Sequence, residues 1–295
     1  MSYVAAEIAS QPAMWQRAAE LATTRNVATA LPASGERVAI VGCGTSLFMA
    51  QAAAALRESA GHGETDAHPA SEFPAHRRYD RIIAITRSGT TTEVVRLLEH
   101  LPDGQQATVI TTAATHPAAA HAAAVVMDFA DEESVVQTRF ATATLALWRA
   151  HLGQDIVTAI NDARDELARD VDDELLDRGQ FTFLGSGWTV GLANEAALKL
   201  REAAQSWTEA YPAMEFRHGP ISVVDERSAV WIFGPVPTGL SEEIAGTGAR
   251  VVQSAIDPMA HLVGAQRLAV AIAERKGLDP DAPRHLTRSI VLAAT

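Results

Sequence analysis

Cysteine is almost absent from this sequence, because Cys43 is the only one among 295 residues. One thiol can form no disulfide within the chain and cannot build a zinc site from several cysteines. Long apolar runs are lacking too, since no stretch reaches the roughly 18 residues that a membrane helix needs. The first residues, MSYVAAEIASQPAMW, show no basic region followed by an apolar one, so no secretory signal is evident. We therefore expect a cytoplasmic protein with no membrane partner and no metal.

Basic side chains are also scarce: the sequence has 24 Lys and Arg against 36 Asp and Glu, which gives a formal net charge of −12. This balance argues against a broad nucleic-acid surface and against binding to anionic membranes. A small anionic ligand remains possible, because a pocket can be locally positive on a negative protein. The hydrophobic fraction of 47% is enough for a substantial core. The length fits two domains, or one large one.

The chain repeats itself once. The segment Val38–Ser46, VAIVGCGTS, leads into an Ala-rich helical stretch and then into Pro-Ala-Ser-Glu-Phe at 69–73. The segment Phe181–Thr189, FTFLGSGWT, leads into another helical stretch and then into Pro-Ala-Met-Glu-Phe at 212–216. The two copies lie about 143 residues apart. Matched blocks in the same order at one offset indicate a duplicated α/β domain.

Short apolar runs bounded by turn residues predict the strands: Val38–Val41, Ile82–Thr86, Ala107–Thr111, Phe181–Leu184 and Ala229–Phe233. Helical stretches such as Thr91–His100 and Leu192–Gln205 alternate with them. The pattern predicts two tandem doubly wound (flavodoxin-like) α/β domains, with parallel sheets flanked by helices. We place an N-terminal helix and the first domain in residues 1–152 and the second domain in residues 153–295. The polar stretch Asp155–Arg178 is typical of a solvated helix that joins the halves.

Two loops of the first half follow predicted strands, at the sheet edge where open parallel sheets bind ligands. The loops are GCGTS at 42–46 and TRSGTTTE at 86–93, which opens a helix. Hydroxyls and backbone N–H groups in such turns suit a phosphate, and Arg87 could add a fork of donors. The alternative is an ordinary turn with a Ser or Thr N-cap. The corresponding loop of the second half, at 233–239, contains prolines and no basic residue, so we expect one phosphate site per chain.

The second half carries the reactive side-chain types. Helical spacing in NEAALKLRE puts Glu195, Lys199 and Glu202 on one face. The alternative is an ion pair of Glu195 with Lys199 on the surface. His218 precedes Gly-Pro and is expected in a non-helical turn, where loops tend to expose functional groups. The alternative there is a turn histidine satisfied by the backbone.

Taken together, GCGTS, TRSGTTTE, NEAALKLRE, EFRHGP and the tail KGLDPDAPRHL resemble the sugar isomerase (SIS) family, most closely the isomerase half of glucosamine-6-phosphate synthase. The resemblance implies a homodimer in which Glu202 moves a proton between C1 and C2 of a sugar phosphate. It implies that Lys199 lies beside the open-chain sugar and that His218, from the partner subunit, helps to open the ring. It also implies a set of hydroxyl side chains that hold the phosphate: Thr45, Ser46, Thr86, Ser88 and Thr91.

Three departures from that family bear on the chemistry. The synthase has a glutaminase domain with an N-terminal cysteine nucleophile, whereas this chain begins Met-Ser-Tyr and has its thiol in a glycine turn, so we expect no glutamine-dependent amide transfer. The family lysine that forms a Schiff base falls on Arg288, whose always protonated guanidinium cannot form an imine but can bind an anion or a hydroxyl. Arg87 stands where the synthase has glutamine, as in free-standing deaminases and isomerases of the family.

The expected function is therefore an enzyme of amino-sugar phosphate catabolism that uses C2-proton chemistry without a metal or organic cofactor. Deamination with aldose–ketose isomerisation of a glucosamine 6-phosphate type of substrate is the first choice. The alternative is β-elimination from N-acetylglucosamine 6-phosphate, because an acylated amine blocks hydrolysis. A third hypothesis is a non-catalytic sugar-phosphate sensor. The segment before Val38 is short and not basic, which disfavours the DNA-binding domain that such sensors usually carry.

Overall fold

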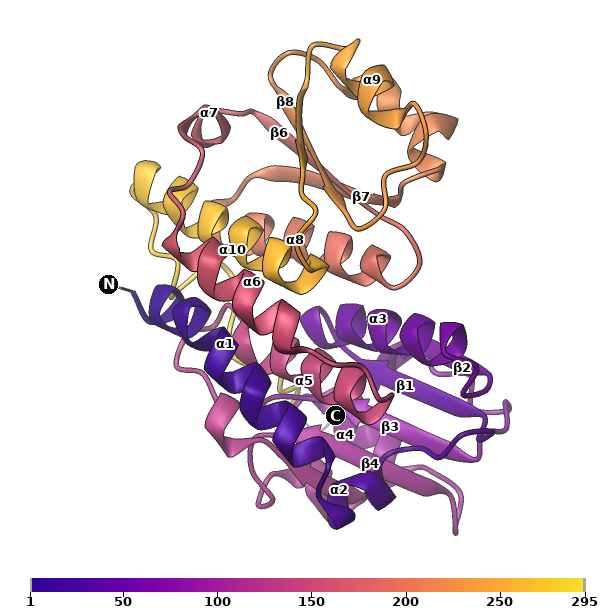
Figure 1. The fold of residues 1–295 in the computed structure, drawn as a ribbon. Coiled ribbons are helices and arrows are strands. Elements are labelled where there is room, and N and C mark those ends of the chain that lie inside the picture. The colour runs from indigo at the N-terminus through magenta and orange to yellow at the C-terminus, as the bar shows by residue number, and fades with distance from the viewer. Residues whose placement is uncertain (1, 294–295) are drawn as a thin grey trace. The chain divides into compact units, whose positions relative to one another are not determined.

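The computed structural model describes residues 2–293 of the chain (Figure 1). The chain divides into two compact units. The first, here called the N-unit, comprises residues 13–132, 139–156 and 287–295. The second, the C-unit, comprises residues 1–12, 133–138 and 157–286. Each unit has its own parallel sheet, which confirms the predicted α/β class, whereas the predicted boundary after residue 152 stays a prediction.

The N-unit is built on a five-stranded parallel sheet of order β2-β1-β3-β4-β5. Its strands are β1 (Val38–Gly42), β2 (Thr65–Pro69), β3 (Arg81–Ile85), β4 (Gln106–Thr111) and β5 (Ala123–Val126). Its helices are α2 (Arg25–Ala30), α3 (Thr45–Ser59), α4 (Thr92–Glu99) and α5 (Arg139–His151), and α1 (Tyr3–Ala22) contributes from residue 13 on. On one face of the sheet, Val94 and Leu98 of α4 pack against Val41 and Ala84. Helix α3 packs along β1 on the other face (Figure 1).

The C-unit has a four-stranded parallel sheet of order β7-β6-β8-β9. Its strands are β6 (Gln180–Gly185), β7 (Trp207–Pro212), β8 (Ser228–Phe233) and β9 (Arg250–Gln253). Its helices are α6 (Val157–Ala168), α7 (Asp173–Leu176), α8 (Thr189–Ala204), α9 (Leu240–Ala245) and α10 (Pro258–Arg275). Helix α9 covers one face and α8 and α10 cover the other (Figure 1). The ring of His261 in α10 packs at a tilt against Trp231 of β8, with ring centroids 4.6 Å apart, so aromatic packing contributes to the second face.

The register of the strands bears out the duplication. Gly42 at the end of β1 pairs with Pro69 of β2, and Gly185 at the end of β6 pairs with Pro212 of β7. Both glycines are required by the close approach of the following helix. A Cβ on Gly42 would lie 2.6 Å from the carbonyl carbon of Ser46, and one on Gly185 would lie 2.3 Å from a backbone oxygen. The same strand–glycine–helix junction is therefore built twice.

The predicted strands are all present, but two other expectations need correction. Residues 155–178 do not form one solvated helix: α6 and the short α7 are separate, with a break between them. Ala159, Ile160 and Ala163 of α6 are buried, because they form an apolar stripe on a segment whose overall composition is polar. Strands β2, β5, β7 and β9 are the edge strands of the two sheets, and none of them was predicted from the sequence. The sequences of β2 and β9 carry no apolar run that would mark a strand.

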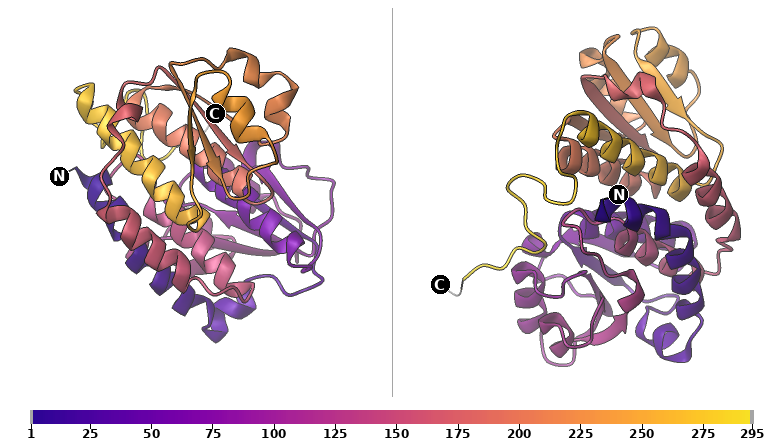
Figure 2. Two further views of the ribbon diagram at one scale, coloured as in Figure 1. Left: turned by 45° about the horizontal axis from the view of Figure 1, so that its top comes forward. Right: turned by 90° about the vertical axis from the view of Figure 1, so that its left-hand side faces the viewer.

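After α10 the described chain, to residue 293, runs on without a further helix or strand (Figure 2). Residues 287–293 of this tail belong to the N-unit. Among residues 2–293, no helix is both long enough and apolar enough to cross a membrane.

Candidate functional site

The two loops that were predicted to bind phosphate lie at the same edge of the N-unit sheet. Strands β1 and β3 are parallel neighbours, so the loops that follow them, at 42–46 and 86–91, emerge side by side. Thr45 and Ser46 form the first turn of α3 and are buried. The N-cap of α3 is Gly44 and that of α4 is Thr91, and neither end has a side-chain capping bond. The alternative of a Ser or Thr N-cap therefore fails for α3, whereas α4 does begin at a Thr N-cap, although the hydroxyl of Thr91 makes no capping bond.

The loop at 86–91 is held in shape by its own polar groups. The Thr86 hydroxyl accepts a hydrogen bond from the Gly89 N–H at 3.2 Å, and the Ser88 hydroxyl accepts one from the Thr90 N–H at 3.2 Å. Gly89 has φ +59°, and a Cβ there would lie 2.3 Å from the Cβ of His116. Thr86 is thus part of the frame of the loop, and Ser88, Thr90 and Thr91 carry the hydroxyls of its partly exposed side.

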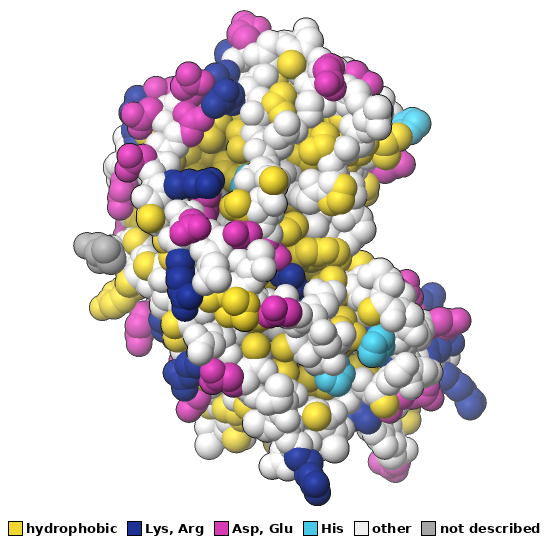
Figure 3. Space-filling view, viewed as in Figure 1, with side chains coloured by type: hydrophobic (Ala, Val, Ile, Leu, Met, Phe, Trp, Pro, Cys, Tyr) yellow, Lys and Arg dark blue, Asp and Glu magenta, His cyan; other side chains and the backbone are white. Residues whose placement is uncertain are grey.

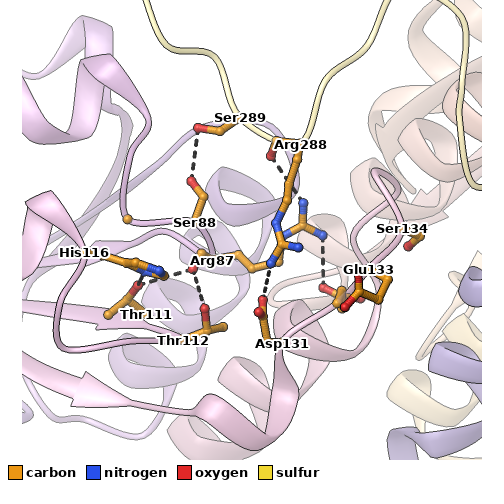
Figure 4. A network of polar contacts seen from close by, with 12 residues as sticks. Arg87, Ser88, Thr111, Thr112, His116, Asp131, Glu133, Ser134, Arg288 and Ser289 are labelled. Atoms are coloured by element: carbon orange, nitrogen blue, oxygen red, sulfur yellow. Dashed lines mark hydrogen bonds and ion pairs between the residues drawn. The ribbon is translucent and has the colours of Figure 1, made fainter.

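Three of these hydroxyls converge on one oxygen of the tail, Ser289 Oγ, and Figure 4 shows its contact with Ser88. Ser289 Oγ lies 3.0 Å from Ser88 Oγ, 3.0 Å from Thr90 Oγ1 and 3.4 Å from Thr91 Oγ1. An oxygen surrounded by hydroxyl donors is the arrangement that an anionic oxygen requires. Sequence reasoning identified Ser88 and Thr91 but missed Thr90 and Ser289, since nothing in the sequence brings the tail to this loop.

Arg87 is placed differently from the prediction that its guanidinium binds phosphate. It is 5% exposed and pairs with Glu132, which is fully buried, at an N–O distance of 3.4 Å. A second guanidinium nitrogen donates to the carbonyl oxygen of Arg288 at 3.2 Å. Glu132 also accepts from the N–H of Arg139 at 2.8 Å. A buried arginine needs such partners, and here they hold the loop, the tail and the start of α5 together.

Arg288 forms an ion pair with Asp131, and both side chains are more than a third exposed (Figure 4). Its guanidinium is therefore directed to a carboxylate of the same unit in the described structure. Glu132 and Asp131 stand in the run Asp-Glu-Glu after β5, which looks in the sequence like an ordinary solvated turn. That resemblance explains why neither acidic residue was predicted to belong to the site.

In the C-unit, α8 brings three charged groups together as the helical spacing predicted. Lys199 Nζ lies 2.5 Å from Glu202 Oε2 and 3.5 Å from Glu195 Oε1. Lys199 is 1% exposed and Glu195 is fully buried, so the alternative of a surface ion pair is wrong. Burial of the two charges of Glu195 and Lys199 is costly unless they compensate one another. A cluster of this kind at a cavity is typical of a functional site.

Glu202 is the member of this cluster that reaches an open space. Its side chain is 18% exposed and lines a surface cavity of about 390 Å³. The other residues of this cavity come from the end of α8 and from the tail: Leu198, Arg201, Gln205, Ser206, Arg284, His285 and Leu286. A hexose-sized ligand fits within such a volume. His285 adopts φ +66°, which is unusual for a residue with a side chain, so the tail turns sharply at the rim of this cavity.

His218 is the last residue of a single 3₁₀ turn, Glu215–His218, rather than part of a non-helical turn. The next residue, Gly219, has φ +139°, which only glycine adopts readily, and it ends the turn. His218 is exposed, and its ring makes no hydrogen bond or ion pair within residues 2–293. Within these residues, the ring of His218 is therefore not hydrogen-bonded to the backbone, contrary to the alternative for a turn histidine.

Acidic, histidine and cysteine side chains are the groups that could form a metal-binding arrangement. Within residues 2–293, no group of three or more His, Cys, Asp and Glu side chains is placed to hold a metal ion. On the face shown in Figure 3, acidic and basic side chains are interspersed rather than gathered into one basic patch.

Cys43 lies in the first loop, but its thiol is poorly suited to act as a nucleophile. Burial, and then the negative charge of Glu93, raise the pKa of Cys43 to about 11, against a smaller opposing effect of a backbone hydrogen bond at Ala70. The thiolate is the reactive form of cysteine. We predict that iodoacetamide alkylates Cys43 at pH 8 about 100-fold more slowly than a free thiol of ordinary pKa. Mass spectrometry over time measures this, with the urea-unfolded chain as the matched control, and equal rates would contradict it.

The geometry can be compared with known proteins. The SIS domain family matches residues 33–152. Glutamine–fructose-6-phosphate aminotransferase (isomerizing) of Sulfurisphaera tokodaii is 26% identical over 297 residues, which cover 88% of this chain and 50% of that protein. The same enzyme of Zymomonas mobilis is 26% identical over 316 residues, covering 87% of this chain and 52% of that protein. This chain thus spans about half the length of these curated relatives.

Two solved structures are similar over nearly the whole chain. Glucosamine-6-phosphate deaminase of Thermotoga maritima has a TM-score of 0.81 and 25% identity, covering 99% of this chain and all of that one. Tagatose-6-phosphate ketose/aldose isomerase of Escherichia coli has a TM-score of 0.80 and 19% identity, covering 99% of this chain and 96% of that one. The latter likeness establishes the fold alone.

Proposed function

We propose that the protein is a phosphosugar enzyme that deaminates and isomerises an amino-sugar 6-phosphate. The proposal starts from two findings: residues 33–152 are a SIS domain, and the chain is homologous to the isomerase domain of glutamine–fructose-6-phosphate aminotransferase. The single observation that carries the proposal is the Lys199–Glu202 pair on α8, 2.5 Å apart, with Glu202 at a cavity. The likeness to a glucosamine-6-phosphate deaminase over the whole chain supports the choice of an amino sugar.

The phosphate group is bound by the loop at 86–91 in this proposal. The hydroxyls of Ser88, Thr90 and Thr91 face the same point, and the N-terminus of α4 adds backbone N–H groups with the positive end of its dipole. Thr45 and Ser46 stand at the neighbouring N-terminus of α3. Arg87 acts here by holding the loop through Glu132 rather than by contact with the phosphate.

Glu202 is the base in the proposed reaction. It removes the proton from C2 of the open-chain aldose, the electron pair of the C–H bond forms a C1–C2 double bond, and O1 takes a proton. Return of a proton to C1 then gives an imine at C2, which water hydrolyses to a ketose and ammonia. Lys199 fixes the carboxylate by a charge-assisted hydrogen bond, and its positive charge beside the reaction stabilises the negative charge that develops on O1.

His218 has a separate role in the proposal, as the group that assists ring opening. Its exposure and lack of a partner within residues 2–293 suit a side chain that acts at the site of a second copy of the chain. A homodimer with shared active sites therefore remains the proposed assembly.

The proposal is tested by proton NMR in heavy water with hexose, hexosamine and N-acetylhexosamine 6-phosphates. We expect solvent deuterium at C2 or C1 and release of ammonia with a hexosamine 6-phosphate. Exchange without ammonia would indicate a simple isomerase. Loss of the C3 hydroxyl from an N-acetylhexosamine 6-phosphate would indicate β-elimination. Binding without exchange for every compound would contradict the enzyme and leave a sugar-phosphate sensor.

A further inference from the structure

The C-unit contains a second cavity, here called the α10 cavity, with a volume of about 180 Å³. It is lined by residues of α6, of the end of β9 and of α10, beside Trp231 of β8. Among residues 2–293, none lines both this cavity and the cavity at Glu202. We propose that the α10 cavity binds a small neutral polyol, which it holds through the imidazole of His261 and the carboxylate of Glu166. The inference does not depend on the proposed reaction.

His261 supplies a hydrogen-bond donor to the α10 cavity. Its side chain is 4% exposed, and its Nδ1 lies 3.2 Å from Trp231 Nε1. An indole nitrogen can only donate, so Nδ1 accepts and the proton of the neutral ring is on Nε2. Burial, and then the positive charge of Arg169, lower the pKa of His261 to about 3, so the ring is neutral near pH 7. The Nε2–H has no partner within residues 2–293 and is the polar group that the ring offers to the cavity.

Glu166 supplies an acceptor to the same cavity. Its side chain is 14% exposed, and Oε2 pairs with Arg169 Nη1 at 3.2 Å. In the described part of the chain, Oε1 makes no hydrogen bond. Burial raises the pKa of Glu166, and the charges of Arg169 and Arg267 oppose this effect. A poorly solvated carboxylate oxygen gains free energy from a hydrogen-bond donor, which a ligand with a hydroxyl group provides.

Gly264 makes room for the carboxylate of Glu166. A Cβ at position 264 would lie 2.4 Å from Glu166 Oε1 and 3.5 Å from Trp231 Cη2. The carboxylate oxygen and the indole ring therefore meet over the same point of α10. His261 lies three residues earlier on this helix and so faces the same side. Glycine inside a helix costs stability relative to alanine, and here it leaves the space that the acceptor occupies.

The walls of the α10 cavity carry charges of both signs that offset one another. Arg169 pairs with Glu166, and Asp172 pairs with Arg250. Arg267 donates to the carbonyl oxygen of Glu166. A charged ligand would lose its hydration here without gaining an opposite charge that lacks a partner. A neutral ligand avoids this cost.

Two adjacent hydroxyl groups match the polar atoms that remain. One hydroxyl can donate to Glu166 Oε1 while its neighbour accepts from His261 Nε2–H, because each hydroxyl both donates and accepts. The carbon atoms that carry them can pack on the apolar ring of Trp231. The cavity therefore suits a polyol better than a purely apolar molecule, which would leave both polar groups without a partner.

The volume of the α10 cavity limits the size of the ligand. A cavity of about 150 Å³ holds benzene, a molecule of six heavy atoms. The α10 cavity, at about 180 Å³, has room for a molecule of similar size, such as glycerol. It is too small to enclose a hexose phosphate, so its ligand differs from the proposed substrate.

NMR of the indole N–H groups of the full chain, with glycerol as the probe, tests the inference. The Trp231 Nε1–H reports on the site because it donates to the ring that would bind the ligand, and its signal is assigned by its loss in Trp231→Phe. We expect a saturable shift with a Kd of about 1 mM, since six heavy atoms at ordinary ligand efficiency give this affinity. No shift, or a shift that grows linearly without saturation, would overturn the site.

Two variants place the binding in this cavity. Gly264→Ala should raise the Kd for glycerol about ten-fold, because its methyl group takes the position of Glu166 Oε1. Its stability to urea should not fall, since alanine favours a helix and the end of the Glu166 side chain can move aside. Glu166→Gln should raise the Kd about five-fold, because a neutral acceptor forms a weaker hydrogen bond than a carboxylate. An unchanged Kd in both variants would overturn the site.

Asp165→Asn is the matched control. Asp165 is an exposed neighbour of Glu166 on α6 and does not line the α10 cavity, so its Kd should stay unchanged. An equal rise in Asp165→Asn and Glu166→Gln would show a general effect of charge and contradict the assignment of Glu166.

The class of ligand is tested with acetamide, inorganic phosphate and ammonium chloride in place of glycerol. We expect none of them to give a saturable shift of Trp231 at a Kd below that of glycerol. Tighter binding of acetamide would indicate an amide site, and tighter binding of phosphate or ammonium would indicate a site for a charged ligand. Each of these results contradicts the polyol.

Discussion

Replacing Glu202 with glutamine should lower kcat by about 10²-fold to 10⁴-fold while leaving phosphate binding intact. Glutamine keeps the size and much of the hydrogen bonding of the side chain but cannot accept a proton from carbon, and a positioned general base is worth about that factor. The phosphate loop lies on a different unit and contains none of the atoms that change. The measurement is the initial rate with the hexosamine 6-phosphate that the wild-type protein converts, together with calorimetry of inorganic phosphate.

The matched control for this variant is Glu242→Gln. Glu242 is an exposed residue of α9 in the same unit, does not line the cavity at Glu202 and should keep full activity. Normal turnover by Glu202→Gln would show that another group removes the proton. Loss of activity in both variants would point to a general effect of charge on the C-unit rather than to a base.

Replacing Lys199 with methionine should cost about 3 to 5 kcal/mol in the free energy of unfolding. Methionine fills a similar length but leaves the fully buried carboxylate of Glu195 without the positive charge 3.5 Å away. Breaking a buried ion pair by removing one partner has this order of cost, because the remaining charge loses the compensation of its partner. Urea unfolding followed by circular dichroism measures the change.

The double variant Lys199→Met with Glu195→Gln is the control that isolates the charge. Removing the carboxylate charge together with the ammonium should recover a large part of the lost stability, and a double-mutant cycle gives the coupling directly. A single variant as stable as the wild-type protein would show that the three charges on α8 do not depend on one another. In that case Lys199 would not be the group that fixes Glu202.

The parts of the fold that follow from local pattern were predictable. Apolar runs such as Val38–Val41 mark strands because both faces of a parallel sheet are buried. The repeated glycine at 42 and 185 marks a junction that no side chain can enter. The shared face of Glu195, Lys199 and Glu202 follows from helical spacing alone.

Other features depend on contacts between distant residues, which no local pattern encodes. Spacing on a helix cannot tell that Lys199 is 1% exposed, because burial is decided by what packs over it. Arg87 looks in the sequence like a free donor, but Glu132 binds it from 45 residues away. Ser289 lies 201 residues from Ser88 along the chain, so its place in the loop could come only from the three-dimensional structure.

The central claim is that this protein moves the C2 proton of an amino-sugar phosphate with its own carboxylate. The most direct measurement is the incorporation of solvent deuterium into glucosamine 6-phosphate and its ketose product, for the wild-type protein and for Glu202→Gln. We predict deuterium at C1 or C2 with the wild-type protein and none above background with Glu202→Gln. Ammonia release by the wild-type protein without any deuterium in substrate or product, or equal incorporation by both proteins, would contradict the claim.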